Sequence, residues 1–223
     1  MPKLTATLLL LCTALFAQQK GTFTDTRDGK IYKTTKIGEQ VWMAENLNYE
    51  AEGSRCYKDK KDYCNYYGRL YNWEMAKTAC PSGWHLPDSL EWKVLVTTAG
   101  GDTIAGKYLK AAISWKHSTP NEDKFGFSAL AGGGGNFLTL KHLGKDGLWH
   151  LDSSDNRNFN FFRGFRESGY WWSYNGRLYM SWNGNEAGFH SSDNEDNDND
   201  NDRVMYSIRC LQDTPAPPKG EAK

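Results

Sequence analysis

Hydrophobic residues repeat with the period of a helix in residues 89–99. Four of them fall at i, i+3, i+4 and i+7 and therefore share one face: Trp92, Leu95, Val96 and Ala99. Asp88 and Glu91 form a capping box, in which each side chain accepts a hydrogen bond from the other residue's backbone N–H. The pattern predicts an amphipathic helix that begins at Ser89 and stops at Gly100-Gly101.

Periodic stretches on both sides of this helix predict the remaining elements. Apolar residues three and four apart indicate further helices at 68–79 and, shorter, at 103–112. Alternation or β-branched side chains indicate strands at 31–37, 40–43, 125–130, 169–174, 177–182 and 203–211. The stretch 45–65 is predicted as a loop, because it is polar and shows no sustained period. The glycine run 132–135 is also predicted as a loop and not as a phosphate-binding loop, because no Gly-Lys-Ser/Thr follows it. An α+β fold follows, with two main helices, a twisted antiparallel sheet and long loops.

Length and charge restrict the class of protein. The chain has 223 residues, 39% of them hydrophobic, which is enough for one domain with a proper core, expected at 18–213. Basic and acidic residues number 27 each, so the formal net charge is zero. The chain therefore lacks the basic field that holds nucleic acid or anionic lipid, and neither is expected as a partner. We expect a monomer.

Residues 1–17 have the pattern of a secretory signal peptide. An apolar stretch follows Lys3, is too short to span a bilayer and ends at Ala17, a small residue suited to cleavage. A core helix is the alternative, but the stretch lacks a polar face. A lipoprotein anchor at Cys12 is disfavoured, because Leu11 stands where a small residue is needed. We expect a secreted or outer-surface protein without a membrane span and with a proline-rich disordered tail at 214–223.

Four cysteines remain once such a signal is removed: Cys56, Cys64, Cys80 and Cys210. An even number in an exported chain predicts two disulfides. Three pairings are open, and local spacing favours Cys56 with Cys64 and Cys80 with Cys210. The second pairing would staple the last strand to the helix at 68–79, and in the chain-entropy model it contributes about 4 to 5 kcal/mol.

Residues that carry common catalytic chemistry do not form a recognised motif. No two histidines stand at i, i+4 on a helix, so a zinc site has little support: His85, His117, His142, His150 and His190. We interpret His85 as a partly buried core histidine. No Gly-x-Ser-x-Gly occurs and the cysteines are used in bridges, which disfavours a nucleophilic enzyme. Paired carboxylates stay open, because glycosidase acids need only be neighbours in space. We assign no catalytic residue and no cofactor from these patterns.

Aromatic residues gather between positions 171 and 182, on two predicted strands. Successive side chains of a strand face opposite sides of the sheet, so some of these rings should be exposed. Exposed Trp and Tyr beside amides suit sugar binding, because the C–H groups of a pyranose pack on a ring face. The candidate ligand-binding residues are Trp171, Trp172, Tyr174, Tyr179, Trp182, Asn183 and Asn185. The alternative is that the rings fill a core and an edge.

An acidic stretch, Asp193 to Asp202, has six carboxylates in ten positions, alternating with asparagines. Its composition cannot bury apolar area, so one interpretation is a solvated loop. Oxygen ligands at alternate positions also suit calcium, although Asn201 and Ser207 stand where an EF-hand needs glycine and glutamate. We expect at most weak calcium binding by four residues of this stretch: Asp196, Asp198, Asp200 and Asp202.

Several further motifs follow one another along the chain. They are Thr24-Asp25 with Asp28-Gly29-Lys30, Trp42-Met43-Ala44-Glu45-Asn46-Leu47, Tyr67-Gly68-Arg69-Leu70-Tyr71, Cys80-Pro81-Ser82-Gly83-Trp84-His85-Leu86-Pro87, Phe125-Gly126-Phe127-Ser128-Ala129-Leu130, Gly169-Tyr170-Trp171-Trp172-Ser173 and Ser207-Ile208-Arg209-Cys210. In this order they resemble the Fibrobacter succinogenes major paralogous domain, over about residues 21–213.

The resemblance implies an exported bacterial domain without an established activity. It also implies a C-type lectin-like fold, related to formylglycine-generating enzymes, with a bridge from the first helix to the last strand. The chain lacks the calcium-binding Glu-Pro-Asn or Gln-Pro-Asp loop of sugar-binding C-type lectins. Those lectins also carry a Trp-Asn-Asp strand, and in Trp182-Asn183-Gly184 a glycine replaces its aspartate. It also lacks the reactive cysteine pair of formylglycine-generating enzymes, since Cys210 is needed for the staple.

Taken together, these observations predict an exported, non-catalytic binding module for a polysaccharide or a cell-surface protein. Two alternatives stay open. One is an exported enzyme that acts on carbohydrate, and the other is a purely structural surface domain.

Overall fold

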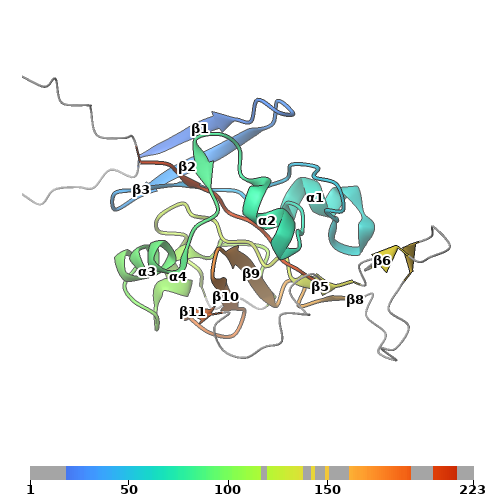
Figure 1. The fold of residues 1–223 in the computed structure, drawn as a ribbon. Helices are drawn as coiled ribbons and strands as arrows, with labels where there is room; N and C mark the ends of the chain where they lie inside the picture. The colour runs from blue at the N-terminus through green and yellow to red at the C-terminus, as the bar shows by residue number, and fades with distance from the viewer. Residues whose placement is uncertain are drawn as a thin grey trace, which may run out of the picture.

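The computed structural model describes residues 19–116, 120–137, 142–143, 149–150, 161–191 and 203–214. The expected signal peptide, the acidic stretch and almost all of the proline-rich tail lie outside the described residues. The described chain combines helices with antiparallel sheets, as the sequence predicts (Figure 1).

The largest sheet has five strands and brings the two ends of the described chain together (Figure 1). In spatial order its strands are β1 (Lys20–Thr24), β2 (Ile31–Ile37), β3 (Gln40–Met43), β13 (Leu211–Gln212) and β4 (Trp84–His85). Leu211 pairs with Trp42 on one side and with His85 on the other. The strands predicted at 31–37 and 40–43 are confirmed, and the last strand is inserted between two early ones.

A second sheet is a meander of three strands: β9 (Ser168–Ser173), β10 (Gly176–Ser181) and β11 (Ala187–Ser191). Leu178 of β10 pairs with Trp171 on β9 and with Phe189 on β11. Both strands that the sequence predicted here are confirmed within one residue at each end.

The glycine run 132–135 does not form the predicted loop, because its second half enters a strand. A third sheet has the order β12 (Val204–Met205), β5 (Gly134–Asn136), β8 (Phe161–Arg163), and a two-stranded ladder pairs β6 (His142–Leu143) with β7 (Trp149–His150). A Cβ atom on Gly134 would lie 2.8 Å from the ring of Tyr206. Glycine is therefore needed for β5 to pack against the aromatic residue of the neighbouring chain segment.

Residues 203–211, predicted as one strand, are divided among four partners. Val204 and Met205 pair with β5, and Tyr206 bridges to Tyr71. Ser207 bridges to Trp171 on β9, and Leu211 enters the five-stranded sheet. The residues at 125–130 are also not a strand. They form a turn instead, in which the Gly126 N–H donates to Asp123 and only Ala129 makes a strand-like bridge.

The helix predicted at Ser89 is confirmed as α3 (Ser89–Thr98), with both hydrogen bonds of the capping box formed. Helix α2 (Trp73–Ala79) is shorter than predicted, because the Asn72 side chain caps it and the chain before Asn72 forms bridges. Helix α4 (Ala105–Leu109) lies within the predicted stretch. A helix that the sequence did not predict, α1 (Lys61–Tyr67), follows the 3-10 turn η1 (Tyr57–Asp59).

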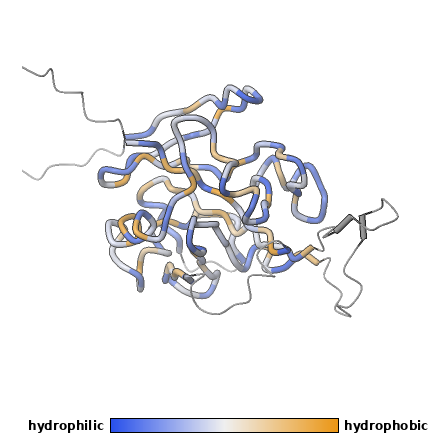
Figure 2. The backbone as a smooth tube through the Cα atoms, in the orientation of Figure 1, coloured by the Kyte–Doolittle hydropathy of each residue, from blue (hydrophilic) through white to orange (hydrophobic). Residues whose placement is uncertain are grey.

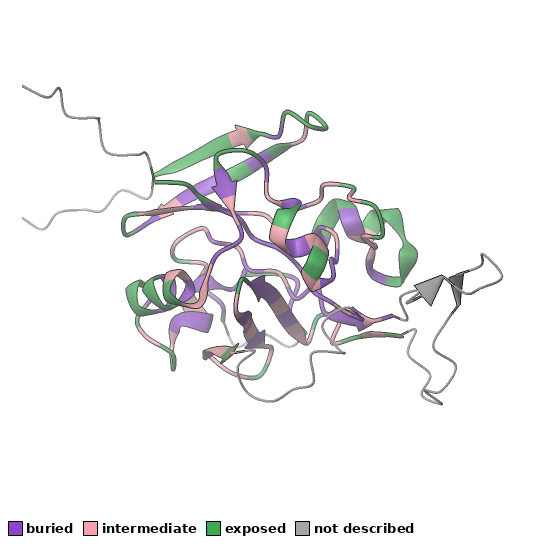
Figure 3. Ribbon diagram, in the orientation of Figure 1, coloured by how far each residue is buried: buried purple, intermediate pink, exposed green. Residues whose placement is uncertain are grey.

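Strand β9 lies between two hydrophobic clusters, so both of its faces are covered. Trp171 belongs to the cluster beneath α3, which includes Trp42 and Trp92, whereas Trp172 belongs to the cluster around Tyr71. Figure 3 shows this buried centre, with the outer faces of α1 and α3 exposed. Hydrophilic residues dominate the turn between β1 and β2 (Figure 2).

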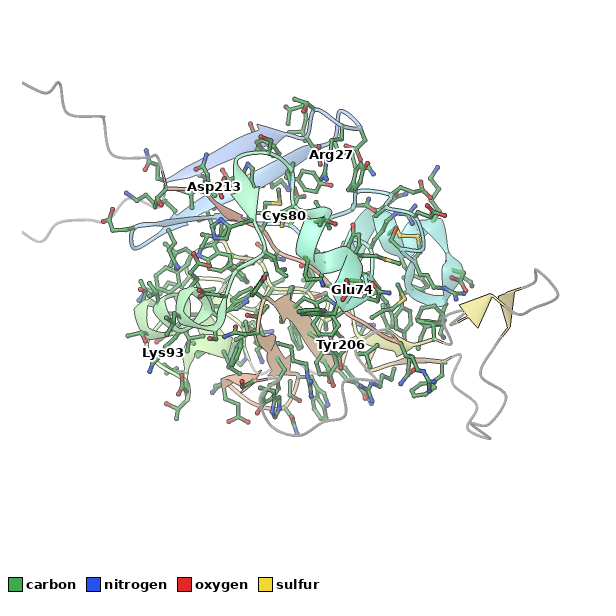
Figure 4. The ribbon with its side chains drawn as sticks, viewed as in Figure 1. Arg27, Glu74, Cys80, Lys93, Tyr206 and Asp213 are labelled. Atoms are coloured by element: carbon green, nitrogen blue, oxygen red, sulfur yellow. A yellow bond between two sulfur atoms is a disulfide. The ribbon has the colours of Figure 1, made fainter. Side chains whose placement is uncertain are left out.

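Both disulfides favoured by the spacing are present. Cys56 is joined to Cys64 across eight residues, which ties η1 to α1. Cys80 is joined to Cys210 across 130 residues, which connects the end of α2 to the chain just before β13 (Figure 4). The long staple therefore holds the early helical half against the end of the chain.

Candidate binding groove

The two adjacent tryptophans of the predicted sugar-binding cluster lie inside the protein. Trp171 and Trp172 are buried, and their indole N–H groups donate to Asn46 Oδ1 at 2.8 Å and to the Tyr71 carbonyl at 2.7 Å. Neither ring presents a face to solvent, because β9 is packed on both sides. These two residues therefore belong to the core.

The other members of the cluster are dispersed over three places. Tyr174 is 61% exposed, at the turn between β9 and β10. The Tyr179 ring stacks on His190 with centroids 4.7 Å apart. Trp182 is partly buried against the core, and Lys116 Nζ lies 5.8 Å from its ring.

The two predicted amides lie in the turn between β10 and β11. Asn183 is exposed and its Oδ1 accepts from the Ser181 hydroxyl at 2.7 Å. The Asn185 carbonyl accepts from the Lys107 N–H at 3.2 Å, so this turn is packed against α4. Their local role is to shape the turn, and the structure does not gather them with the exposed rings.

Metal binding was predicted only for the acidic stretch, which lies outside the described residues. Within the described residues, no three His, Cys, Asp or Glu side chains are arranged so that they could hold a metal ion. His85 is partly buried, as predicted, but it lies at the edge of the core and contacts two carboxylates. Its Nδ1 lies 2.6 Å from Asp213 and its Nε2 lies 2.9 Å from Glu91.

The described surface is hollowed instead beside α1. The first hollow has a volume of about 720 Å³ and lies between β2, the segment after β3, α1 and the loops at 111–113 and 123–130. Its lining includes Ile31, Tyr66 and Ile113, which are three of the large hydrophobic side chains left exposed. Polar side chains such as Asn46, Asp123 and Ser128 also line it. Apolar rims with convergent polar groups are typical of ligand sites.

Two further hollows continue the first along the surface. The second, of about 460 Å³, shares Tyr66 with the first and is also lined by Ser114. The third, of about 480 Å³, shares Phe165 and Arg166 with the second. Because neighbouring hollows share lining residues, we treat all three as one extended groove, and we call it the groove from here on.

Backbone strain is concentrated along the groove. Six non-glycine residues of the described chain have a positive φ, and four of them line the first or second hollow: Ser114, Asp123, Ser128 and Arg166. Such a conformation costs about 1 to 3 kcal/mol and persists only where the surroundings enforce it. At Asp123, the carboxylate enforces it by accepting from both the N–H and the hydroxyl of Ser128, at 2.8 and 2.6 Å. Strain held in this way is a known mark of functional sites.

A buried hydrogen-bond network holds the segments that form the floor of the first hollow. The Arg209 guanidinium is fully buried, and burial lowers its pKa to about 9. It donates to Asn46 Oδ1 at 2.7 Å and to the carbonyls of Phe127 and Ser128. Asn46 Nδ2 in turn donates to the Tyr67 carbonyl at 2.8 Å. One arginine and one asparagine thus fix α1 and the 123–130 turn relative to each other.

Charged residues along the groove are mostly paired. Lys30 Nζ lies 2.9 Å from Asp28, and Lys116 Nζ lies 2.6 Å from Glu167. Among the described residues, no carboxylate forms an ion pair with Arg166, which is exposed and lines two hollows. Ser114 Oγ is buried and has no hydrogen-bond partner within the described part of the chain. The exposed Arg166 guanidinium is therefore available to a ligand.

Sequence reasoning did not find the groove. Its residues come from segments far apart along the chain, and strained or unpaired side chains leave no periodic signal. The only sequence signal near it is the set of family motifs, because Asn46, Phe127, Ser128 and Arg209 all fall within them. Of these motif residues, Asn46 and Ser128 line the first hollow, whereas Phe127 and Arg209 belong only to the supporting network beneath it.

The fold and the cysteine pairing together define a disulfide-stapled α+β domain. Residues 35–212 match the model of the Fibrobacter succinogenes major domain, and the chain therefore belongs to that family. Searches among curated proteins and among solved structures find no match to this chain.

Family membership and the two disulfides indicate an extracytoplasmic domain. None of the helices among the described residues has the length and apolar character needed to cross a membrane.

Proposed function

We propose that this protein is an exported, non-catalytic module that binds an extended polysaccharide in the groove. The observation that carries the proposal is the continuity of three hollows along one surface, with Tyr66 shared by two of them. A chain of sugar units needs such an elongated site, whereas a small ligand needs one pocket. The Tyr66 side chain, 48% exposed, supplies a ring on which a pyranose can pack.

We also propose that the fold is of the C-type lectin-like kind. Two helices flanking the long staple, and a last strand inserted between early ones, support this view. The sugar site would differ from the calcium site of those lectins, because it lies beside α1 and uses aromatic and polar side chains.

The test is retention of the purified domain on insoluble or immobilised cellulose, xylan and pectin. Tyr66→Ala should weaken binding to the retained polysaccharide about three- to tenfold, the value of one ring stacking contact. The matched control is Tyr174→Ala, because Tyr174 is also an exposed tyrosine but lies outside the groove. It should bind as the wild type does.

Three results would contradict the proposal. The first is failure of the wild type to bind any of the polysaccharides. The second is equal loss in both variants. The third is loss in Tyr174→Ala alone, which would return the site to the β9–β10 turn that the sequence favoured.

A further inference from the structure

We propose that the second and third hollows of the groove form a subsite for a sugar unit that carries a carboxylate, bound by the Arg166 guanidinium. The inference rests on the proposed polysaccharide-binding function and names the class of polymer: one that contains uronic acid. Arginine suits this role, because its planar fork donates two parallel hydrogen bonds to a carboxylate.

Arg166 is held where such a group would be needed. Its φ is 63°, a conformation that a bulky side chain rarely adopts. Backbone hydrogen bonds on both sides enforce it: the Arg166 N–H donates to Ala131 at 2.9 Å, and its carbonyl accepts from the Lys116 N–H at 2.6 Å. The root of the side chain is therefore fixed, and binding loses less conformational entropy than it would on a loose loop.

The charges of the two hollows give the orientation of the sugar unit. Asp62 and Arg166 both line the second hollow, so their charges balance. The third hollow is lined by Lys116 and Arg166 against Glu167 alone, which leaves one net positive charge. Lys116 is already paired with Glu167 at 2.6 Å. The carboxylate of the ligand therefore belongs at the third hollow, next to the guanidinium.

The second hollow supplies the contacts for the sugar ring. Tyr63 and Phe165 line it with aromatic surface. Ser114 is only 8% exposed, and its Oγ has no partner among the described residues. A buried hydroxyl without a partner costs free energy. Ser114 also has a positive φ, of 94°, so two strained residues meet at this subsite.

The experiment uses pairs of polymers that differ only in the carboxylate. Polygalacturonate is compared with its fully methyl-esterified form, and glucuronoxylan with its carboxyl-reduced form, by affinity electrophoresis. The wild type should bind the acidic member of at least one pair at least tenfold more tightly. Arg166→Gln should remove that preference, and Arg166→Lys should keep only part of it, because lysine lacks the bidentate geometry.

Two further variants separate binding from folding and from general charge. Arg166→Gly removes the guanidinium and relieves the positive φ, so it should melt no lower than the wild type and still lose the preference. Lys93→Gln removes one positive charge from the outer face of α3, outside the groove (Figure 4). This control should bind like the wild type.

Each result bears on a different claim. Equal binding of the acidic and neutral members of both pairs would overturn the carboxylate subsite and leave polysaccharide binding in the groove intact. Retention on neutral polysaccharides alone would likewise overturn the carboxylate subsite and leave polysaccharide binding intact. Equal losses in Arg166→Gln and Lys93→Gln would show non-specific attraction and also overturn it. Failure to bind any acidic or neutral polysaccharide would overturn the proposed function itself.

Discussion

The side-chain oxygen of Asn46 accepts hydrogen bonds from two buried residues that lie far away in the sequence. Its Oδ1 accepts from the Trp171 indole and from two nitrogens of Arg209, at 2.8, 3.2 and 2.7 Å. Removing this oxygen would leave a buried cation and a buried indole N–H without their shared acceptor. A buried charge that loses its hydrogen bonds has no water to replace them.

Asn46→Ala should therefore lower the free energy of unfolding by about 3 kcal/mol, the combined cost of the two orphaned donors. Urea denaturation followed by tryptophan fluorescence would measure it. Asn65→Ala, on the exposed face of α1, is the control and should change stability by less than about 0.5 kcal/mol. A loss in Asn46→Ala no larger than that of the control would show that Arg209 does not depend on this acceptor.

His85 makes stability depend on pH. Burial disfavours the charged ring, but the hydrogen bonds that this ring donates to Asp213 and Glu91 outweigh burial, so the pKa of His85 lies above its ordinary value. The folded protein then holds this proton more tightly than the unfolded chain does. The resulting stabilisation is fully present below the unfolded pKa of about 6.5 and is lost as pH rises through the folded pKa.

His85→Gln should accordingly cost more stability at pH 5.5 than at pH 8.5. The difference should be below about 1 kcal/mol, because the side chain is more than a third exposed and water screens both ion pairs. Thermal melts of both proteins at the two pH values would show it. His190→Gln is the control, since the His190 ring stacks on Tyr179 and, among the described residues, forms no ion pair with a carboxylate. The same pH dependence in both variants would show that the contacts of His85 with Asp213 and Glu91 are not its source.

At the scale of elements, the sequence predicted those that local chemistry determines. Helix α3 was predicted from its start to within two residues of its end, because the capping box and the apolar face lie within one short stretch. Residues 203–211 were mispredicted as one strand, because four partners from distant parts of the chain divide them. No local pattern encodes those partners.

The two disulfides should differ in their contribution to stability. In the chain-entropy model, the bridge that spans 130 residues contributes about 5 kcal/mol, and the bridge that spans eight residues contributes about 2.5 kcal/mol. Replacing Cys80 and Cys210 together by serine should thus destabilise the domain by about 2.5 kcal/mol more than replacing Cys56 and Cys64. Denaturant unfolding of the two double variants measures the difference. An equal loss would mean that the unfolded chain is already so compact that the long bridge restricts it no more than the short one does.

At the scale of the whole molecule, the groove crosses the boundaries between elements. Its walls come from β2, α1, the 111–116 segment, the 123–130 turn and the residues after β8. A ligand that touches all of them binds only the folded state. It should therefore stabilise the whole domain and not one element.

A polysaccharide fragment at ten times its Kd should stabilise the domain by about 1.4 kcal/mol, which raises Tm by about 3 to 6 °C. Differential scanning calorimetry of wild type and Tyr66→Ala at one fragment concentration would measure this. The variant should show the smaller shift, because its Kd is higher. A fragment that binds without raising Tm would show that it contacts the unfolded chain equally well.

The position of the candidate site could not be predicted from the sequence, because it depends on which strand faces are covered in the folded chain. The sequence analysis searched for exposed aromatic residues, but it assumed that one face of each strand meets solvent. Strand β9 has both faces covered, so Trp171 and Trp172 became core residues. The exposed ring of the groove, Tyr66, lies on α1, a helix without a clear apolar period that only tertiary packing and the Cys56–Cys64 bridge hold in place.

The pairing of β1 with β2 has a consequence for how the domain can be displayed. Lys20 pairs with Thr35 and Thr24 with Ile31, so the described chain starts near one end of β2 and the groove begins at the other, about 13 Å along the strand. The chain leaving β13 runs antiparallel to β3 toward that same starting end. A tether at either terminus would leave the groove unobstructed. Several copies linked in tandem would then bind one polymer simultaneously, with an avidity about 10²- to 10⁴-fold above the affinity of a single copy.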